Sequence, residues 1–146
     1  MAQIESIIGK EFPEKVIPLI NDAKHSIKII VFDWRWYPQD PGNPVQLFNQ
    51  AIIRASRRGV EIKVLTNIDE VVRILKSQGI KAQKLISKKL LHAKTMILDG
   101  EILVIGSHNY TSSAFQMNHE ISAIVRGAED LQSFINFFNH LYGPIS

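Results

Sequence analysis

The sequence contains no cysteine, and it has no apolar run long enough to cross a membrane. Without cysteine the chain can form no disulfide, no thiolate metal site and no thiol nucleophile. A membrane-spanning helix needs roughly 18–20 consecutive apolar residues, and no stretch approaches this length. Glu5, Lys10 and Glu11 come too early for the apolar core of a signal peptide. We therefore expect a cytoplasmic protein with no integral membrane association.

Acidic residues are also missing from a long central stretch, between Glu70 and Asp99. The basic residues in this stretch are Arg73, Lys76, Lys81, Lys84, Lys88, Lys89 and Lys94. The whole chain is only modestly basic, with 17 basic and 14 acidic residues and a net charge of +3. The local surplus is either a solvated lysine face or a surface that attracts a polyanion. Its position just before the motifs described below favours the second interpretation, with Lys88 and Lys89 as candidate groove residues.

A length of 146 residues and a hydrophobic content of 45% suit one domain that covers residues 1–146. Apolar periodicity predicts helices at residues 12–24, 45–58, 69–78 and 129–142. Strands are predicted at residues 26–32, 60–65, 80–86 and 91–98, and another apolar run follows a turn at residue 99. The alternation predicts an α/β fold with a mixed, largely parallel sheet flanked by helices on both faces.

A loop rich in Pro, Gly, Asn and Asp follows the first buried strand, at residues 33–44, and carries Trp34 and Trp36. These aromatic rings could pack at a domain or subunit interface. Alternatively, they could line a substrate groove, because an aromatic face can stack on any base. The loop follows a buried strand, where open α/β sheets place their ligands, so both interpretations remain open.

Residues 91–120 hold the densest group of polar side chains. On a strand, His92 and Lys94 would project from the same side. The Asp-Gly pair at 99–100 indicates a hairpin. A two-residue loop would place His92 opposite Ser107, whereas a three-residue loop would pair it with His108. We favour the first register because it gathers His92, Lys94, Ser107 and Asn109 on one face.

Each of these residue types has a role in cleaving a phosphodiester. The neutral imidazole of His92 can attack phosphorus and form a covalent phosphohistidine. Lys94 and Asn109 can hold the non-bridging oxygens as negative charge builds up on them, and Ser107 can add a hydrogen bond. A carboxylate on the second ring nitrogen would orient the histidine and fix its tautomer, and Glu120 is the candidate for this role.

The residues form a string that resembles the full signature of the phospholipase D superfamily, His92-x-Lys94-x4-Asp99-x6-Gly106-Ser107-x-Asn109. Asn118-x-Glu120 is similar to the downstream element of that superfamily, and residues 26–65 are similar to its usual first half. Within the string we expect Asp99 and Gly106 to be structural. The resemblance implies a phospholipase D-like α/β/α sandwich.

The resemblance also implies a hydrolase that needs no metal or other cofactor. The sequence agrees, because it has no clustered carboxylate pair and no His-x3-His helix pattern. Two motifs per active site are implied, with one histidine as nucleophile and the other as general acid. This chain has one copy, so a symmetric homodimer would supply the second, with the two His92 residues meeting at the two-fold axis.

Short, basic, single-motif members of the superfamily resemble endonucleases that cut DNA or RNA with little sequence preference, and this is the first expectation. A phospholipid hydrolase, for instance on cardiolipin, is the alternative with the same chemistry, but no amphipathic membrane helix or lipid anchor supports it. A nucleic-acid-binding module without catalysis is disfavoured by the intact motif. The remaining histidines are expected to be ordinary surface or supporting residues: His25, His108, His119 and His140.

Overall fold

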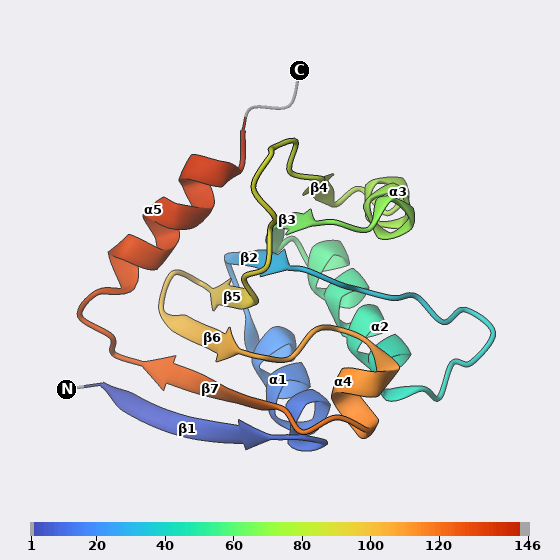
Figure 1. The fold of residues 1–146 in the computed structure, drawn as a ribbon, viewed down its shortest axis with the longest axis horizontal. Coiled ribbons are helices and arrows are strands. Elements are labelled where there is room, and N and C mark those ends of the chain that lie inside the picture. The colour runs from blue at the N-terminus through green and yellow to red at the C-terminus, as the bar shows by residue number, and fades with distance from the viewer. Residues whose placement is uncertain (1, 144–146) are drawn as a thin grey trace.

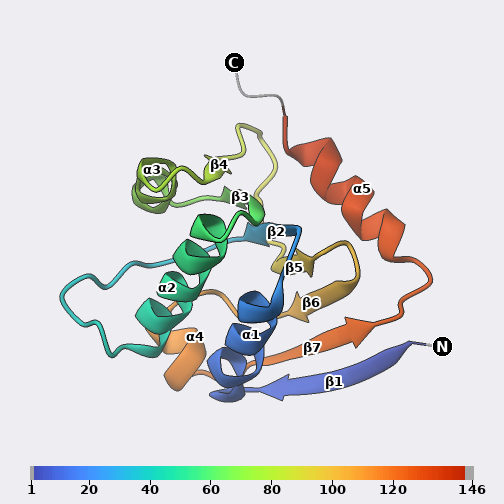
Figure 2. The same cartoon turned by 180° about the vertical axis from the view of Figure 1, so that it is seen from behind.

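The computed structural model describes residues 2–143, which build a seven-stranded sheet with helices on both faces (Figures 1 and 2). The strand order is β1-β7-β6-β5-β2-β3-β4. The strands are β1 (Gln3–Ile8), β2 (Ser26–Val31), β3 (Glu61–Thr66), β4 (Lys81–Gln83), β5 (Thr95–Leu98), β6 (Ile102–Gly106) and β7 (Ile121–Arg126). The helices are α1 (Glu11–Asp22), α2 (Pro44–Arg57), α3 (Asp69–Ser77), α4 (Ser112–Gln116) and α5 (Leu131–Leu141).

The sheet is mixed, as predicted, but its parallel part is small. β2, β3 and β4 are parallel to one another. β5 pairs antiparallel with β2, and β6, β7 and β1 continue the antiparallel part. The expectation of a largely parallel sheet is therefore wrong. The reason is that apolar periodicity did not reveal β1 and β7. These two strands extend the β5–β6 hairpin to four strands, against the three that helical crossovers join.

Apolar side chains cover both faces of this sheet. On one face, Ile29 of β2 and Val104 of β6 belong to the largest core cluster, together with residues of α1, α2 and α4. Figure 2 shows α1 and α2 in front of the strands on this side. On the opposite face, Ile97 and Leu103 pack against Leu131 of α5. The arrangement is an α/β/α sandwich.

The β5–β6 hairpin has a three-residue loop, because Leu98 pairs with Ile102 and leaves residues 99–101 in the turn. The register that we favoured, with His92 opposite Ser107, is therefore wrong. A second difference is that β5 begins only at Thr95, so His92 precedes the strand instead of lying on it.

Asp99 explains this loop, because it fastens the hairpin to the start of β2. Its carboxylate accepts hydrogen bonds from the backbone N–H groups of Lys24, His25 and Ser26, at 2.7–3.1 Å. Burial alone would raise the pKa of Asp99, but these hydrogen bonds outweigh it and hold the pKa below its ordinary value. Asp99 adopts a positive φ of 55°, which the three N–H contacts compensate.

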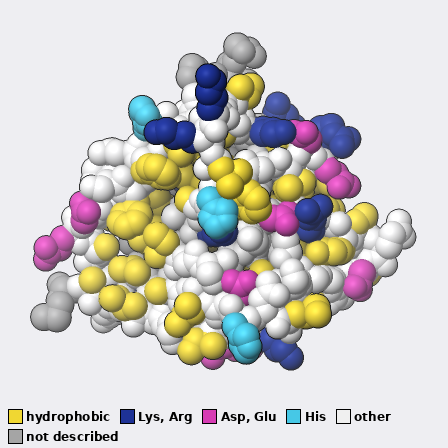
Figure 3. Space-filling model, in the orientation of Figure 1, with side chains coloured by type: hydrophobic (Ala, Val, Ile, Leu, Met, Phe, Trp, Pro, Cys, Tyr) yellow, Lys and Arg dark blue, Asp and Glu magenta, His cyan; other side chains and the backbone are white. Residues whose placement is uncertain are grey.

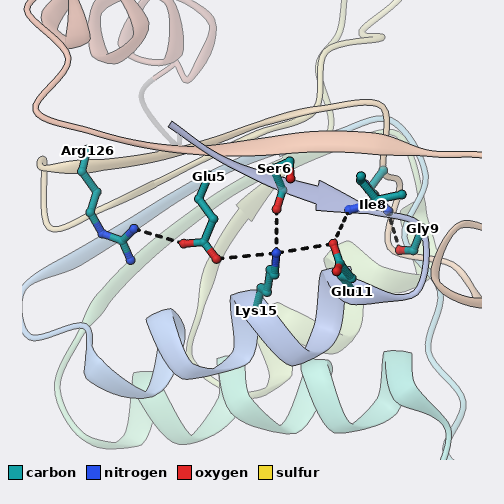
Figure 4. A network of polar contacts seen from close by, with 8 residues as sticks. Glu5, Ser6, Ile8, Gly9, Glu11, Lys15 and Arg126 are labelled. Carbon is teal, nitrogen blue, oxygen red and sulfur yellow. Dashed lines mark hydrogen bonds and ion pairs between the residues drawn. The ribbon is translucent and has the colours of Figure 1, made fainter. Parts of the chain in front are cut away.

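β1 lies at one end of the strand order, and side chains of α1 hold it (Figure 4). Lys15 donates to the carbonyl oxygen of Ser6 at 2.8 Å and forms ion pairs with Glu5 and Glu11. Glu11 accepts a hydrogen bond from the backbone N–H of Ile8 at 2.9 Å. A lysine over an edge strand discourages another chain from pairing with it.

Candidate active site

His92 lies at the surface, where the chain between β4 and β5 comes down to the sheet (Figure 1). Its ring packs against Phe32, with the ring centroids 5.1 Å apart. The ammonium nitrogen of Lys94 lies 3.3 Å from Nδ1 and 3.5 Å from Nε2 of His92. The same ammonium lies 5.7 Å from the centre of the Phe32 ring. An imidazole held in this way is open to a phosphate group from solvent and has a cation beside it.

Lys94 connects the His92 side of the site to the end of β6 and to Glu120. Its carbonyl oxygen accepts a hydrogen bond from the N–H of Gly106 at 3.4 Å, which ties it to the end of β6. Burial lowers the pKa of Lys94, and the negative charge of Glu120 opposes that shift. The two charged side chains therefore share one electrostatic neighbourhood, although they come from different parts of the motif.

Gly106 permits the close approach of β6 and β7. It pairs with Ser122, and a Cβ atom at position 106 would overlap the Cα and Cβ atoms of Ser122. Only glycine leaves the room that this approach needs. The chain leaves β6 at this point and leads directly to Ser107 and Asn109.

Ser107 and Glu120 face each other across the gap between β6 and β7. The Ser107 hydroxyl donates to Oε1 of Glu120 at 2.5 Å and accepts from the backbone N–H of Ile121 at 3.0 Å. The other carboxylate oxygen of Glu120 accepts from the side-chain amide of Asn118 at 3.0 Å. Within one chain, Glu120 thus holds Ser107 and Asn118, and the predicted role of orienting His92 is not what the contacts show. Its place beside Ser107 follows from the antiparallel pairing of β6 with β7, which the sequence did not reveal.

Asn109 approaches the site from the side of β2. Its Oδ1 atom accepts a hydrogen bond from the backbone N–H of Asp33 at 3.1 Å. With Oδ1 fixed, the NH₂ group of Asn109 is the end that can donate to an oxyanion. Phe32, the residue before Asp33, carries the His92 ring, so two neighbouring residues after β2 position both polar groups. The sequence analysis missed Phe32 and Asp33, although the end of a buried strand was the signal for them.

His108 is a buried supporting residue between two candidate site residues. Its Nδ1 lies 2.7 Å from the Ser122 hydroxyl, and its Nε2 lies 2.9 Å from the carbonyl oxygen of Gly9. The ring stacks on Phe12 at 4.6 Å, and burial lowers the pKa of His108. These contacts fix the backbone that carries Ser107. The other three histidines outside the motif are exposed.

The tryptophans of the 33–44 loop belong to the core. Trp34 is fully buried, donates from Nε1 to Oδ1 of Asn49 at 2.6 Å, and packs edge-on against Tyr110. Trp36 is partly buried and packs against the same cluster. The groove interpretation is wrong for Trp34, because no part of its ring is left for a base.

Lys88 and Lys89 lie exposed on the segment that precedes His92. A hollow of about 620 Å³ opens beside His92, and its lining combines Lys89 with apolar side chains such as Leu90 and Phe137. Figure 3 shows Lys and Arg side chains gathered in the upper part of this face, with hydrophobic side chains among and below them. The surroundings of His92 are therefore cationic and apolar at the same time.

Two kinds of feature are absent from residues 2–143. Their His, Asp and Glu side chains form no group of three or more that could hold a metal ion. Their helices include none with the length and apolarity that crossing a bilayer requires.

Chemically, the site offers one exposed nucleophile, one cation and one amide donor. An attack on phosphorus can begin from this set, because His92 supplies the lone pair while Lys94 and Asn109 supply the charge stabilisation. The contacts described for His92 within residues 2–143 include no general acid that could protonate the leaving oxygen.

Comparisons with known proteins agree with this reading of the fold. A family model described as cardiolipin synthase, PLD-like domain, matches residues 16–142. The human mitochondrial cardiolipin hydrolase is 29% identical over 140 residues, which are 92% of this chain and 52% of that protein. The chain thus spans about half the length of the curated relatives it matches.

Two bacterial structures have the same fold over nearly their whole length. NucT from Helicobacter pylori superimposes with a TM-score of 0.78 at 16% identity, covering 97% of this chain and 96% of its own. Nuc from Salmonella typhimurium, described as a phospholipase D family member, gives a TM-score of 0.79 at 20% identity and covers 97% and 94%. At these identities the likeness concerns the fold.

Proposed function

The chain belongs to the family of cardiolipin synthase PLD-like domains, within the phospholipase D superfamily, and on this premise we propose that His92 is the nucleophile of a phosphodiesterase. Members of the superfamily are phosphodiesterases. The observation that carries the assignment to His92 is its exposed ring, which Phe32 supports and beside which the Lys94 ammonium lies at 3.3 Å.

The reaction proceeds in two steps, and it uses no metal. A ring nitrogen of His92 attacks phosphorus, the bond to the leaving oxygen breaks, and a general acid protonates that oxygen. Lys94 and the NH₂ group of Asn109 stabilise the charge on the non-bridging oxygens. Water then attacks the phosphohistidine and gives a proton back to the general acid, which lost its own proton in the first step. The bond between phosphorus and His92 breaks, and His92 is free again. Ser107 positions the loop through Glu120, because its hydroxyl proton is already engaged there.

The general acid in this scheme is the His92 of a second copy of the chain, brought in by a symmetric homodimer. An apolar patch beside the half-site supports this arrangement: Ile8, Met117 and Ile121 are each more than half exposed. Ile8 and Ile121 also line a hollow of about 460 Å³ together with Ser107 and Glu120. Exposed apolar side chains around a polar half-site are what a subunit interface provides.

The first candidate substrate is DNA or RNA, cut with low sequence specificity. The exposed Lys88 and Lys89 support it, because phosphate contacts from lysine bind a nucleic acid without reading its sequence. The second candidate is a phospholipid, and a specific observation favours it. The hollow beside His92 has a mostly apolar lining, which suits an acyl chain. The curated relatives, which are named cardiolipin hydrolases, agree with this second candidate.

The decisive test is replacement of the nucleophile, His92→Ala. Wild-type protein in excess chelator should cleave a labelled phosphodiester and, after a rapid alkaline quench, carry label on His92 as an acid-labile phosphohistidine. His92→Ala should show neither cleavage nor label, with its circular dichroism unchanged. The assay should be run side by side on single-stranded DNA, duplex DNA, RNA and cardiolipin vesicles, because the shared chemistry leaves the preferred substrate to the measurement.

His25→Ala is the matched control, because His25 is exposed and lies beside Asp99, away from the contacts of His92. It should keep wild-type activity. Near-normal turnover by His92→Ala would refute the nucleophile assignment, and a rate lost in chelator and restored by Mg²⁺ would refute the metal-independent scheme.

A further inference from the structure

The segment from Lys84 to Leu90 presents apolar side chains to water. Ile86 is 97% exposed and Leu90 is 70% exposed, in a stretch that arches above β4 before it descends to β5 (Figure 1). Removing a large aliphatic side chain from water is favourable, so two of them at the outside of one loop indicate a partner. Neither belongs to one of the three core clusters of residues 2–143.

Lysines surround these two side chains. Lys88 and Lys89 lie between them in the sequence and are exposed. Lys84 adds a third positive charge, although it also pairs with Asp69 at 3.5 Å. No acidic residue occurs between positions 70 and 99 to balance this charge. The segment therefore combines two exposed aliphatic side chains with three lysines around them.

This combination matches the interface of an anionic lipid bilayer. The transfer of aliphatic side chains from water to the boundary between headgroups and acyl chains is favourable. Lysines at the same level are attracted to the headgroup phosphates. The lysine stems can also lie along apolar surface while their charges stay in water. We propose that the Lys84–Leu90 segment docks the protein on an anionic bilayer, with Ile86 and Leu90 inserted and Lys88 and Lys89 at the level of the headgroups.

Other occupants fit the segment less well. A nucleic acid would contact the lysines but would gain little from two aliphatic tips, because bases stack on aromatic rings and the segment contains none. A second copy of the chain has another apolar surface in the proposed homodimer, the exposed side chains of Ile8, Met117 and Ile121.

The docking goes beyond the proposed function, because it does not depend on which phosphodiester is cut. His92 follows Leu90 by two residues, and Leu90 and His92 line the same hollow. A docked segment would hold the mouth of that hollow at the membrane surface. The protein would then act on a substrate that lies in, or passes along, the bilayer.

The test is co-sedimentation with vesicles of phosphatidylcholine alone or with roughly one third phosphatidylglycerol. Wild-type protein should bind the anionic vesicles and not the neutral ones, and high salt should weaken the binding. Ile86→Ser should weaken it by about tenfold, the scale expected for one aliphatic side chain that no longer enters the interface. Ile4→Ser is the matched control, because Ile4 is 73% exposed but lies on β1, at the opposite end of the strand order from β4.

Absence of binding to anionic vesicles, or equal binding by Ile86→Ser and Ile4→Ser, would overturn the proposal. So would a loss of oligonucleotide affinity or of dimer in Ile86→Ser without an effect on vesicles, since the segment would then serve a groove or a subunit interface. Running the same assay with His92→Ala separates docking from catalysis. Vesicle binding should persist in that variant even if the proposed chemistry is wrong.

Discussion

A single hydrogen atom in place of a side chain at Gly106 decides where the polar residues after β6 can lie. Any Cβ atom there would collide with the Cα and Cβ atoms of Ser122 as well as with its hydroxyl oxygen. The collision cannot be relieved by a rotamer change, so β6 or β7 would have to move. Ser107 and Asn109 follow immediately and would move with the strand. Stability and activity are therefore coupled at this residue.

Gly106→Ala should lower the free energy of unfolding by about 2–3 kcal/mol, the usual cost of forcing extra volume into a packed site. Phosphodiester cleavage should fall by at least about tenfold, because a displacement near 1 Å in a positioning group has effects of this size or larger. Urea unfolding followed by circular dichroism and steady-state kinetics would measure the two effects.

Gly42→Ala is the control for this substitution, since Gly42 has no atom near its added Cβ and no positive φ. It should change the free energy of unfolding by less than about 1 kcal/mol. If both alanine variants behaved alike, the close approach of β6 and β7 would not be what requires glycine at position 106.

At the scale of elements, the β5–β6 hairpin is fastened to β2 by one carboxylate. Asp99→Asn keeps the shape but removes the charge that three backbone N–H groups share. The free energy of unfolding should fall by about 2 kcal/mol at pH 7, in the range of a hydrogen bond to a charged group. Denaturant titrations at several pH values would measure this difference.

The pH dependence follows from the lowered pKa of Asp99 in the folded chain. Such a carboxylate stabilises the fold above its unfolded-state pKa, near 3.9, and this contribution is lost as pH falls through the lower folded-state pKa. The gap between wild-type protein and Asp99→Asn should therefore be constant near neutrality and narrow below pH 4. A gap of equal size at pH 7 and pH 3 would show that charge is not the cause.

Elements with a strong apolar period could be predicted from the sequence, and weakly patterned ones could not. β2, α2 and α3 begin and end within about two residues of their predicted bounds, because one face or the whole of each is apolar. β1 was missed because Ile7 is its one buried residue, so no alternation marks it. Its place is set by pairing with β7, a contact between distant parts of the chain.

The candidate site shows the same division. Spacing in the sequence was enough to select His92, Lys94, Ser107 and Asn109 as candidates, because those residue types suit phosphodiester cleavage. It could not show that Glu120 would bind Ser107, because that contact depends on the pairing of β6 with β7. Nor could it show that Asp99 would turn toward β2 and lengthen the hairpin loop. The hydrogen-bond partners of Glu120 and Asp99 depend on how the strands pair in three dimensions, and residue type alone does not determine them.

At the scale of the whole molecule, the proposed active centre needs two chains. Co-expression of wild-type and His92→Ala chains in equal amounts should give about one quarter wild-type dimers by random pairing of two subunits. If both histidines are required, activity per chain should fall to about one quarter of the wild-type value rather than one half. The measurement is turnover of the purified mixture, with sedimentation to verify the dimer.

An activity of one half would mean that each chain works independently, and the composite centre would then be wrong. A mixture of separately folded wild-type and His92→Ala dimers, combined without subunit exchange, is the control and should itself give one half. The difference between the two preparations therefore reports the shared centre directly.

The pairing of β1 with β7 also fixes the order in which a newly made chain can mature. β1 is the first strand of the sheet to leave the ribosome, and its partner β7 is the last. The N–H of Gly9 donates to the carbonyl oxygen of Glu120, and the carbonyl oxygen of Gly9 lies 2.9 Å from Nε2 of His108, so the end of β1 also supports the candidate site. Contacts so distant in sequence form late in folding. A nascent chain therefore lacks the support that β1 gives to the candidate site until all strands of the sheet have been synthesised.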